Sequence, residues 1–314
     1  PGLEPPIGRE AELAALAGLL GRHRLVTLVG PSGIGKTRLL LALGAAQAPL
    51  RPEGVWWVEL AALAPDSTDA ATLLALLAQT LQLGLAAAGS VASLAQALQA
   101  PRLLLLLDNA EHLLPVLAPL LAALLPLAPG LDIVLSSQEP LRIPGEQWFR
   151  LAPLALPALA DDADAGRLMA SAAVRLFVAR VAARLPGFAL APQQQQAVAD
   201  ICRALDGLPL ALELAAARVP LLGVHGIAEL LLGSDGGDRL SLLSRGARNA
   251  APRQRSLRDA LLWSHGLLDE GQRRVLRRLA VFRGGFSLEA AQWVCSDSDR
   301  VDRPAGAAGD WGVL

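Results

Sequence analysis

The segment GPSGIGKTRLL, residues 30–40, decides the fold of this chain. It satisfies the pattern G-x-x-x-x-G-K-[ST] between an apolar run, RLVTLVG (24–30), and a segment of helical composition. Glycines let such a loop curl until successive backbone N–H groups point at phosphate oxygens, and the N-terminus of the following helix adds partial positive charge. The segment therefore predicts a strand, a phosphate-binding loop and a helix.

Lys36 is the only lysine of the 314-residue chain, which has 27 arginines. The abundance of Leu, Ala, Arg, Gly and Pro indicates GC-rich codons, which explains the arginines and makes this lysine an exception. An ammonium group is a compact point charge, and the planar guanidinium fork would not fit a backbone phosphate cradle equivalently. We predict that Lys36 binds the β- and γ-phosphates and serves catalysis, and that the Thr37 hydroxyl binds Mg²⁺.

A magnesium site of this kind needs an acidic residue at the end of a neighbouring buried strand. The run LLLLLD (103–108) provides Asp108, which we predict to be catalytic and to share the Mg²⁺ ion with Thr37. Asn109 follows, where many ATPases have the carboxylate that activates water, and an amide is no general base. Glu111 is the remaining candidate for that catalytic role, although an acid at a helix N-terminus explains it equally well.

Apolar runs alternate with Ala/Leu-rich segments in the first half of the chain, which is typical of a parallel sheet covered by helices. Strands are predicted at 24–30, 54–60, 102–108 and 131–137, with a short fifth at 147–151, and helices at 69–83 and 90–99. The predicted class is α/β, a P-loop NTPase parallel sheet with helices on both faces, over residues 1–152.

Beyond residue 166 the strand pattern ends and helical periodicity continues. An all-α helical domain is predicted over 167–235, with helices at 167–184, 193–205, 208–217 and 224–232. A winged-helix-like domain is predicted over 252–295, with helices at 254–268 and 270–280, and a loose tail over 296–314.

Residues 113–131 are uncharged and almost long enough to cross a bilayer, but Pro115, Pro119, Pro126 and Pro129 interrupt them. Each proline removes a backbone donor, so a buried helix between two strands is the favoured interpretation, with no membrane contact. The two cysteines lack metal-ligand spacing and suggest a reducing cytoplasm. A net charge of −1 gives no global attraction to nucleic acid.

Several motifs occur in a characteristic order between residues 6 and 295. They are IGREAEL (7–13), GPSGIGKTRL (30–39), LLLLLDNAEHLL (103–114), SSQEPLRIPGE (136–146), LDGLPLALELAAARV (205–219), LRDALLWSHGLL (257–268) and FRGGFSLEAAQWVC (282–295). The set resembles the nucleotide-binding core of STAND-class signal-transduction ATPases, the NB-ARC- and AAA-like ATPases of bacterial LuxR- and SARP-type transcriptional regulators. The resemblance implies three domains that close over ADP and open with ATP to expose an assembly surface.

The resemblance also implies roles for residues outside the phosphate loop. It places Ile7 and Arg9 near the adenine and ribose, and Pro209 against the base. Relatives usually carry arginine after the fourth strand to sense the terminal phosphate, whereas this chain has Gln138. The predicted nucleotide-binding residues are Ile7, Arg9, Gly30, Ser32, Gly33, Gly35, Lys36, Thr37, Arg38, Gln138 and Pro209.

These observations predict an ATP/ADP-binding switch with slow or weak hydrolysis that acts with a protein partner or by self-assembly. The alternative is a nucleic-acid-binding module, because residues 245–283 contain ten arginines against three acids. Arg273, Arg274, Arg277 and Arg278 are predicted to lie on one flank of a helix. A metabolic kinase is disfavoured by the helical second half. We also expect the chain to be a fragment of a longer regulator whose flanking domains bind DNA.

Overall fold

A computed structural model describes residues 5–84, 89–99, 102–161, 164–233, 256–282 and 285–296. The chain divides into two compact units, Pro1–Leu262 and Trp263–Leu314, and each is described by itself. The sheet and the helices up to residue 233 belong to the first unit. The predicted domain boundaries at 152, 167, 235, 252 and 295 therefore stay predictions.

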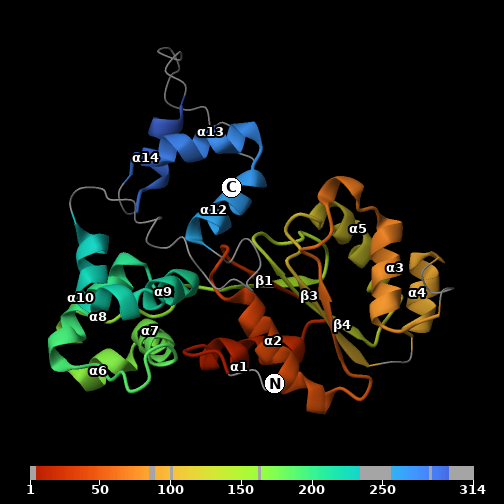
Figure 1. The fold of residues 1–314 in the computed structure, drawn as a ribbon. Coiled ribbons are helices and arrows are strands. Elements are labelled where there is room, and N and C mark those ends of the chain that lie inside the picture. Colours follow the sequence, from red (N-terminus) through yellow and green to blue (C-terminus); the bar gives the residue numbers. More distant parts are fainter. Residues whose placement is uncertain are drawn as a thin grey trace. The chain divides into compact units, whose positions relative to one another are not determined.

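Five parallel strands form the sheet of the first unit, in the order β2-β3-β4-β1-β5 (Figure 1). Their bounds are β1 (Leu25–Val29), β2 (Val55–Glu59), β3 (Leu103–Asp108), β4 (Leu131–Ser137) and β5 (Glu146–Arg150). The central strands are buried on both faces, which explains their unbroken apolar runs. The predicted parallel α/β sheet is confirmed, and the strand of the phosphate loop lies inside it, between β4 and β5.

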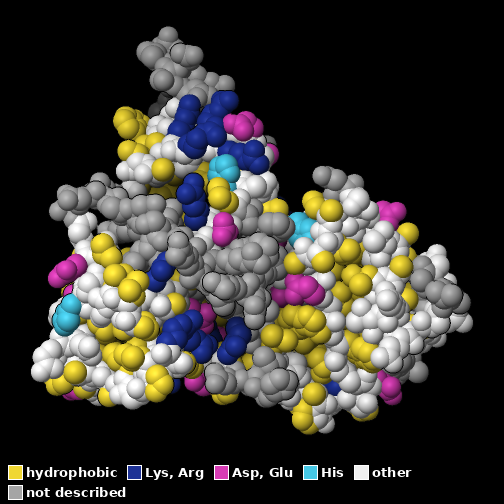
Figure 2. Space-filling model, viewed as in Figure 1, with side chains coloured by type: hydrophobic (Ala, Val, Ile, Leu, Met, Phe, Trp, Pro, Cys, Tyr) yellow, Lys and Arg dark blue, Asp and Glu magenta, His cyan; other side chains and the backbone are white. Residues whose placement is uncertain are grey.

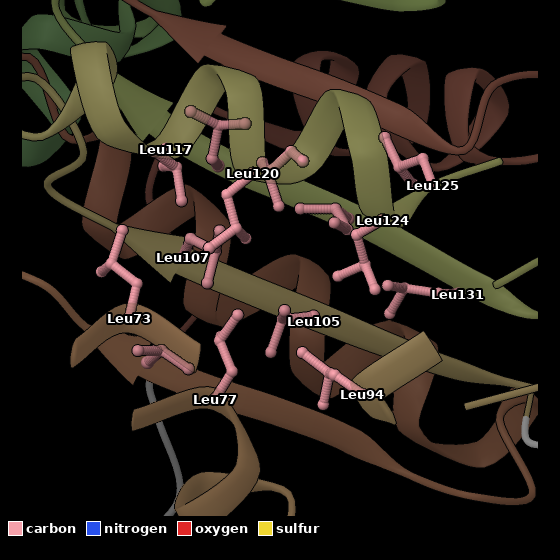
Figure 3. Packing of buried hydrophobic residues seen from close by; sticks show 14 of the residues in the cluster. Leu73, Leu77, Leu94, Leu105, Leu107, Leu117, Leu120, Leu124, Leu125 and Leu131 are labelled. Atoms are coloured by element: carbon pink, nitrogen blue, oxygen red, sulfur yellow. The ribbon is translucent and has the colours of Figure 1, made fainter. Parts of the chain in front are cut away.

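Helices pack on both faces of this sheet. One face carries α1 (Glu10–Leu20) and α2 (Lys36–Gln47), and the other carries α3 (Ala70–Thr80), α4 (Val91–Ala97) and α5 (Leu114–Leu124). Successive residues of β3 alternate between the two cores, because side chains of a strand point to opposite faces. Figure 3 shows Leu105 and Leu107 of β3 among the leucines of α3, α4 and α5. Short 3₁₀ helices span Ala48–Leu50, Pro65–Ser67, Leu159–Asp161 and Pro192–Gln194.

Helix α5 lies within the uncharged stretch 113–131. It runs from Leu114 to Leu124 only, and Leu117, Leu120 and Leu121 of its inner face are buried against the sheet. Pro115 lies in its first turn, where a missing backbone N–H costs little. Within the described ranges, no helix is long and apolar enough to cross a bilayer. The prediction of a buried helix between two strands is confirmed.

Between residues 164 and 233, the described part of the chain forms five helices: α6 (Ala165–Ala170), α7 (Ala172–Ala182), α8 (Gln195–Ala204), α9 (Pro209–Ala216) and α10 (Val219–Leu232). The single helix predicted over 167–184 is wrong, because Ser171 has an extended backbone (φ −67°, ψ 128°) and separates α6 from α7. Its hydroxyl donates to Ala155 O at 2.8 Å and also accepts from the backbone N–H of Val174. Serine favours such a cap because its short side chain reaches backbone donors.

The buried thiol of Cys202 in α8 gives a first testable prediction. Burial raises the pKa of Cys202 to about 12, whereas Cys295 is half-buried, and both cysteines are free thiols. Because the thiolate is the reactive species, we expect Ellman's reagent at pH 8 to modify one thiol in the native protein and two after denaturation. The variant Cys295→Ser should remove the fast reaction. Rapid modification of two thiols in the native state would contradict this description of the helical core.

Three helices are described at the C-terminal end: α12 (Leu257–Gly266), α13 (Glu270–Leu279) and α14 (Leu288–Cys295). Asp269 and Gln272 form a capping box at the start of α13. Within 256–282 and 285–296 the structure assigns helices and no strand. The winged-helix-like domain therefore stays a prediction, and the predicted tail, Ser296 apart, lies outside the described residues.

Candidate functional site

The loop between β1 and α2 curls because two of its glycines adopt backbone conformations that other residues disfavour. Gly33 has φ +79° and Gly35 has φ +100°, both in the left-handed region. Gly35 precedes the first residue of α2, so the N-terminus of that helix faces the loop. At the other end, Gly30 N donates to Ser137 O at 3.2 Å, which fastens the loop to the end of β4.

The ammonium group of Lys36 lies inside this loop. The residue is only 8% exposed, and Nζ donates to Gly30 O at 2.6 Å and to Pro31 O at 3.1 Å. A cation in a backbone loop at a helix N-terminus creates a favourable site for an anion. The geometry therefore suits phosphate. Ser32 belongs to the same loop, and Arg38 is exposed in the first turn of α2.

Asp108 at the end of β3 is the fully buried carboxylate beside the loop. It accepts hydrogen bonds from Thr37 Oγ1 at 2.9 and 3.1 Å, from Asn109 Nδ2 at 2.8 Å, and from the Ser136 hydroxyl. No group of three or more His, Cys, Asp or Glu side chains in the described part of the chain could hold a metal. Mg²⁺ usually binds one or two carboxylates and completes its shell with water and phosphate oxygens. Thr37 and Asp108 fit that mode.

Glu59 is a neighbour of this site that the sequence analysis missed. It ends β2 in register with Asp108 of β3, and its Oε1 accepts a hydrogen bond from Asn109 Nδ2 at 2.8 Å. The side chain is exposed. In the sequence, Glu59 could have been noticed as an acid at the end of the apolar run VWWVE. Only the strand order shows that β2 lies next to β3.

Two further predicted residues carry buried polar atoms without partners. Gln138 follows β4, and its Nε2 has no hydrogen-bond partner. Glu111 follows β3, and its Oε2 likewise has none. A buried donor or acceptor left unpaired costs about 1–3 kcal/mol, so Gln138 Nε2 is a donor that a ligand would satisfy. Glu111 forms no hydrogen bond to Lys36, Thr37 or Asp108, and its catalytic role stays a prediction.

The first turn of helix α9 contacts the phosphate loop. Leu210 N donates to Gly33 O at 3.1 Å, and a Cβ on Gly33 would lie 2.9 Å from Leu210 Cβ. The ring of Pro209 lies 4.0 Å from a Cβ placed on Gly35. The start of α9 and the loop, far apart in the sequence, are therefore in direct contact through Leu210 and Gly33.

Arg9, which lies just before α1, also contacts the phosphate loop. Arg9 is only 4% exposed, and its guanidinium donates to Ile34 O at 3.2 Å and to Glu12 Oε1 at 2.6 Å. Ile7 packs instead against the helical core. Of these predicted residues, Arg9 thus contacts the loop and Pro209 lies beside it, whereas Ile7 packs on the helices. Contacts of the three with a base or ribose stay predictions.

The four arginines of the predicted basic flank lie on helix α13 (Glu270–Leu279). Figure 2 shows the dark-blue side chains of this helix, all of them arginines, gathered on its surface. Arg273 donates to the carbonyls of His265 and Gly266 at the end of α12, and Arg278 donates to Cys295 O at 2.6 Å. Arg277 pairs with Glu270 at 2.7 Å and holds the pKa of that carboxyl below its ordinary value. Three of these four arginines thus make contacts within their own unit, and nucleic-acid binding by this segment stays a prediction.

The chain is similar to known proteins and to one family model. A family model described as an AAA domain matches residues 20–142. The uncharacterized protein Rv0894 of Mycobacterium tuberculosis is 38% identical over 293 residues, which cover 93% of this chain and 69% of that protein. The "Putative HTH-type transcriptional regulator Rv0890c" of the same organism is 39% identical over 281 residues, which cover 90% of this chain and 29% of the regulator.

Two solved structures are also similar. The STAND protein PH0952 from Pyrococcus horikoshii, which has a tetratricopeptide repeat sensor, gives a TM-score of 0.42 at 14% identity, covering 93% of this chain and 37% of its own. The ORC2 protein of Aeropyrum pernix gives 0.48 at 16% identity, covering 93% and 80%. By its identity to Rv0894 and its phosphate loop, the chain belongs to the family of that mycobacterial protein and carries an AAA-type P-loop ATPase domain.

Proposed function

We propose that this chain is the nucleotide-dependent switch of a STAND-type transcriptional regulator of the LuxR or SARP kind, which binds ATP and ADP with Mg²⁺. One observation carries the proposal: the loop that would bind phosphate is bonded directly to helix α9, through Leu210 N and Gly33 O at 3.1 Å. A ligand that rearranges the loop must therefore act on the helices beyond the sheet. The similarity to Rv0890c supports the regulatory setting.

In this proposal, different residues of the site would bind the phosphates and the Mg²⁺ ion. Lys36 and the backbone N–H groups of the loop would hold the β- and γ-phosphates, and Gln138 Nε2 would donate to the terminal one. Thr37 and Asp108 would hold Mg²⁺, which when bound neutralises phosphate charge and orients the terminal phosphoryl group. Gln138 carries no charge, and hydrolysis that lacks a guanidinium is expected to be slow.

A second input is needed to move the switch. Shifting a two-state protein from 1:99 to 99:1 requires about 5.5 kcal/mol of differential affinity. A ligand at 100 times its dissociation constant that binds one state only contributes about 2.7 kcal/mol. Nucleotide alone therefore falls short, and a protein partner or self-assembly would supply the rest.

Nucleotide identification and hydrogen exchange test this proposal. We expect ADP or ATP to copurify with the protein, and the two nucleotides to give different amide exchange in α9 (Pro209–Ala216). Exchange in β3 (Leu103–Asp108), buried in the sheet, is the internal control and should be the same with both. A protein that binds neither nucleotide would overturn the proposal. Equal exchange in α9 with both nucleotides would leave a nucleotide-binding protein that does not switch.

A further inference from the structure

The carboxylate of Glu59 lies at the same edge of the sheet as the phosphate loop. Glu59 and Asp108 are register partners on the neighbouring strands β2 and β3, and Leu60 N continues the ladder by donating to Asp108 O at 3.0 Å. Asp108 in turn contacts Thr37 at the start of α2. The strand order therefore brings a second acid to the site, from a strand that carries no nucleotide-binding motif.

Asn109 holds this acid in place. Its Nδ2 donates to Glu59 Oε1 and to Asp108 Oδ2, both at 2.8 Å, and an amide nitrogen has one hydrogen for each. Asn109 is itself fixed, because its backbone N donates to Ser136 Oγ at 3.0 Å. Its φ of +63° is a left-handed conformation that asparagine tolerates better than most residues. The amide at this position therefore orients a carboxylate and does not replace one.

Three carboxylates are candidates to accept the proton of an attacking water, and they differ in burial and in hydrogen bonds. Asp108 is fully buried and accepts hydrogen bonds from three side chains. Glu111 has no hydrogen bond to the loop or to Asp108, and its Oε2 is buried. Glu59 is exposed to water and is bridged to Asp108 through Asn109. We infer that Glu59 is the catalytic general base of ATP hydrolysis and that Asn109 is its positioning residue, an inference that rests on the proposed function.

The step balances without a further reactant. The water oxygen forms a bond to the γ-phosphorus, and the bond from that phosphorus to the bridging oxygen breaks. The electron pair of the broken bond leaves with ADP. The proton of the water passes to the Glu59 carboxylate, which releases it to solvent because the side chain is exposed.

Single-turnover hydrolysis of ATP by the whole chain tests the inference. Glu59→Gln keeps the shape of the side chain and its acceptor oxygen for Asn109 but removes the base. We expect hydrolysis to fall at least about 100-fold, as for loss of a general base. The matched control Glu53→Gln changes an exposed acid just before β2 and should stay within about threefold of wild type. Affinity for a non-hydrolysable ATP analogue with Mg²⁺, measured by calorimetry, should stay within about threefold in both variants.

A double-mutant cycle tests the role of Asn109. Asn109→Gly suits the positive φ and removes only the amide, so we expect kcat to fall about tenfold with KM unchanged. In the Glu59→Gln background the same change should have no further effect, since residues that act as a unit are not additive. Additive losses would overturn the positioning role.

Several results would overturn the role of Glu59 as the general base. The inference is overturned if Glu59→Gln keeps more than about a third of the activity, or if the control Glu53→Gln loses as much. It is also overturned if Glu111→Gln, which removes the rival acid, loses as much, or if analogue affinity falls as far as the rate. A wild type that binds ATP without hydrolysing it overturns the inference and leaves nucleotide binding standing. A wild type that binds no nucleotide overturns the proposed function as well.

Discussion

Lys36→Ala is expected to lower the affinity for ATP about 1000-fold, which corresponds to about 4 kcal/mol at 1.4 kcal/mol per tenfold change. The reason is the location of the ammonium group, which is 8% exposed and enclosed by the carbonyls of Gly30 and Pro31. Removing one partner of a buried, hydrogen-bonded charge pair costs about 2–5 kcal/mol, because the other charge is left without compensation. Titration calorimetry with ATP and Mg²⁺ measures the effect.

Two further variants show whether the affinity for ATP depends on the shape of the cation at position 36 or only on positive charge. Lys36→Arg keeps the charge but introduces a planar fork, and we expect it to lose at least about 100-fold in affinity. Arg22→Ala removes an exposed cation in the turn after α1 and should change affinity less than about threefold. If Lys36→Ala binds ATP within tenfold of wild type, the loop is not the phosphate site. Thermal unfolding without nucleotide shows whether each variant is folded.

Gly207→Ala is expected to destabilise the first unit by about 2–5 kcal/mol. Gly207 has φ +64°, which costs a residue with a Cβ about 1–2 kcal/mol. The new Cβ would also lie 2.3 Å from Leu154 O, and such overpacking costs typically about 1–3 kcal/mol or more. The backbone cannot give way easily, since Leu154 N donates to Gly207 O at 3.0 Å. Urea unfolding followed by circular dichroism measures the loss.

Gly187→Ala is the matched control for this substitution. Gly187 has φ +85°, but no atom lies within 4 Å of the Cβ position. It should therefore lose only the backbone contribution of about 1–2 kcal/mol. Equal losses in the two variants would show that the contact between Gly207 and Leu154 is not tight. Because Gly207 precedes Pro209 and Leu210, its loss should also weaken the seating of α9 on the phosphate loop.

The fold of the first half could be predicted because its signals are local. The strand at 131–137 was predicted with its observed bounds, since a buried parallel strand is a continuous apolar run with a polar end. The helices were harder to delimit. Ser171 ends α6 because its hydroxyl binds Ala155 O, sixteen residues away, and no local pattern reveals that bond. Within α10, Gly223 is not helical (φ +69°, ψ 167°), so the segment after this kink begins at residue 224, as predicted, and only the turn before it was missed.

The sequence by itself determined the phosphate loop and its chemistry, because Gly33, Gly35, Lys36 and Thr37 act through their own backbone and neighbouring side chains. It also predicted Asp108 as the acid beside Thr37. Only the tertiary structure decided which residues surround that loop. The order of β2 and β3 brings Glu59 to Asp108, and the helices beyond the sheet bring Leu210 to Gly33. The physical reason is that a loop's conformation depends on residues close in the chain, whereas contacts between strands and between helices depend on how the whole core packs.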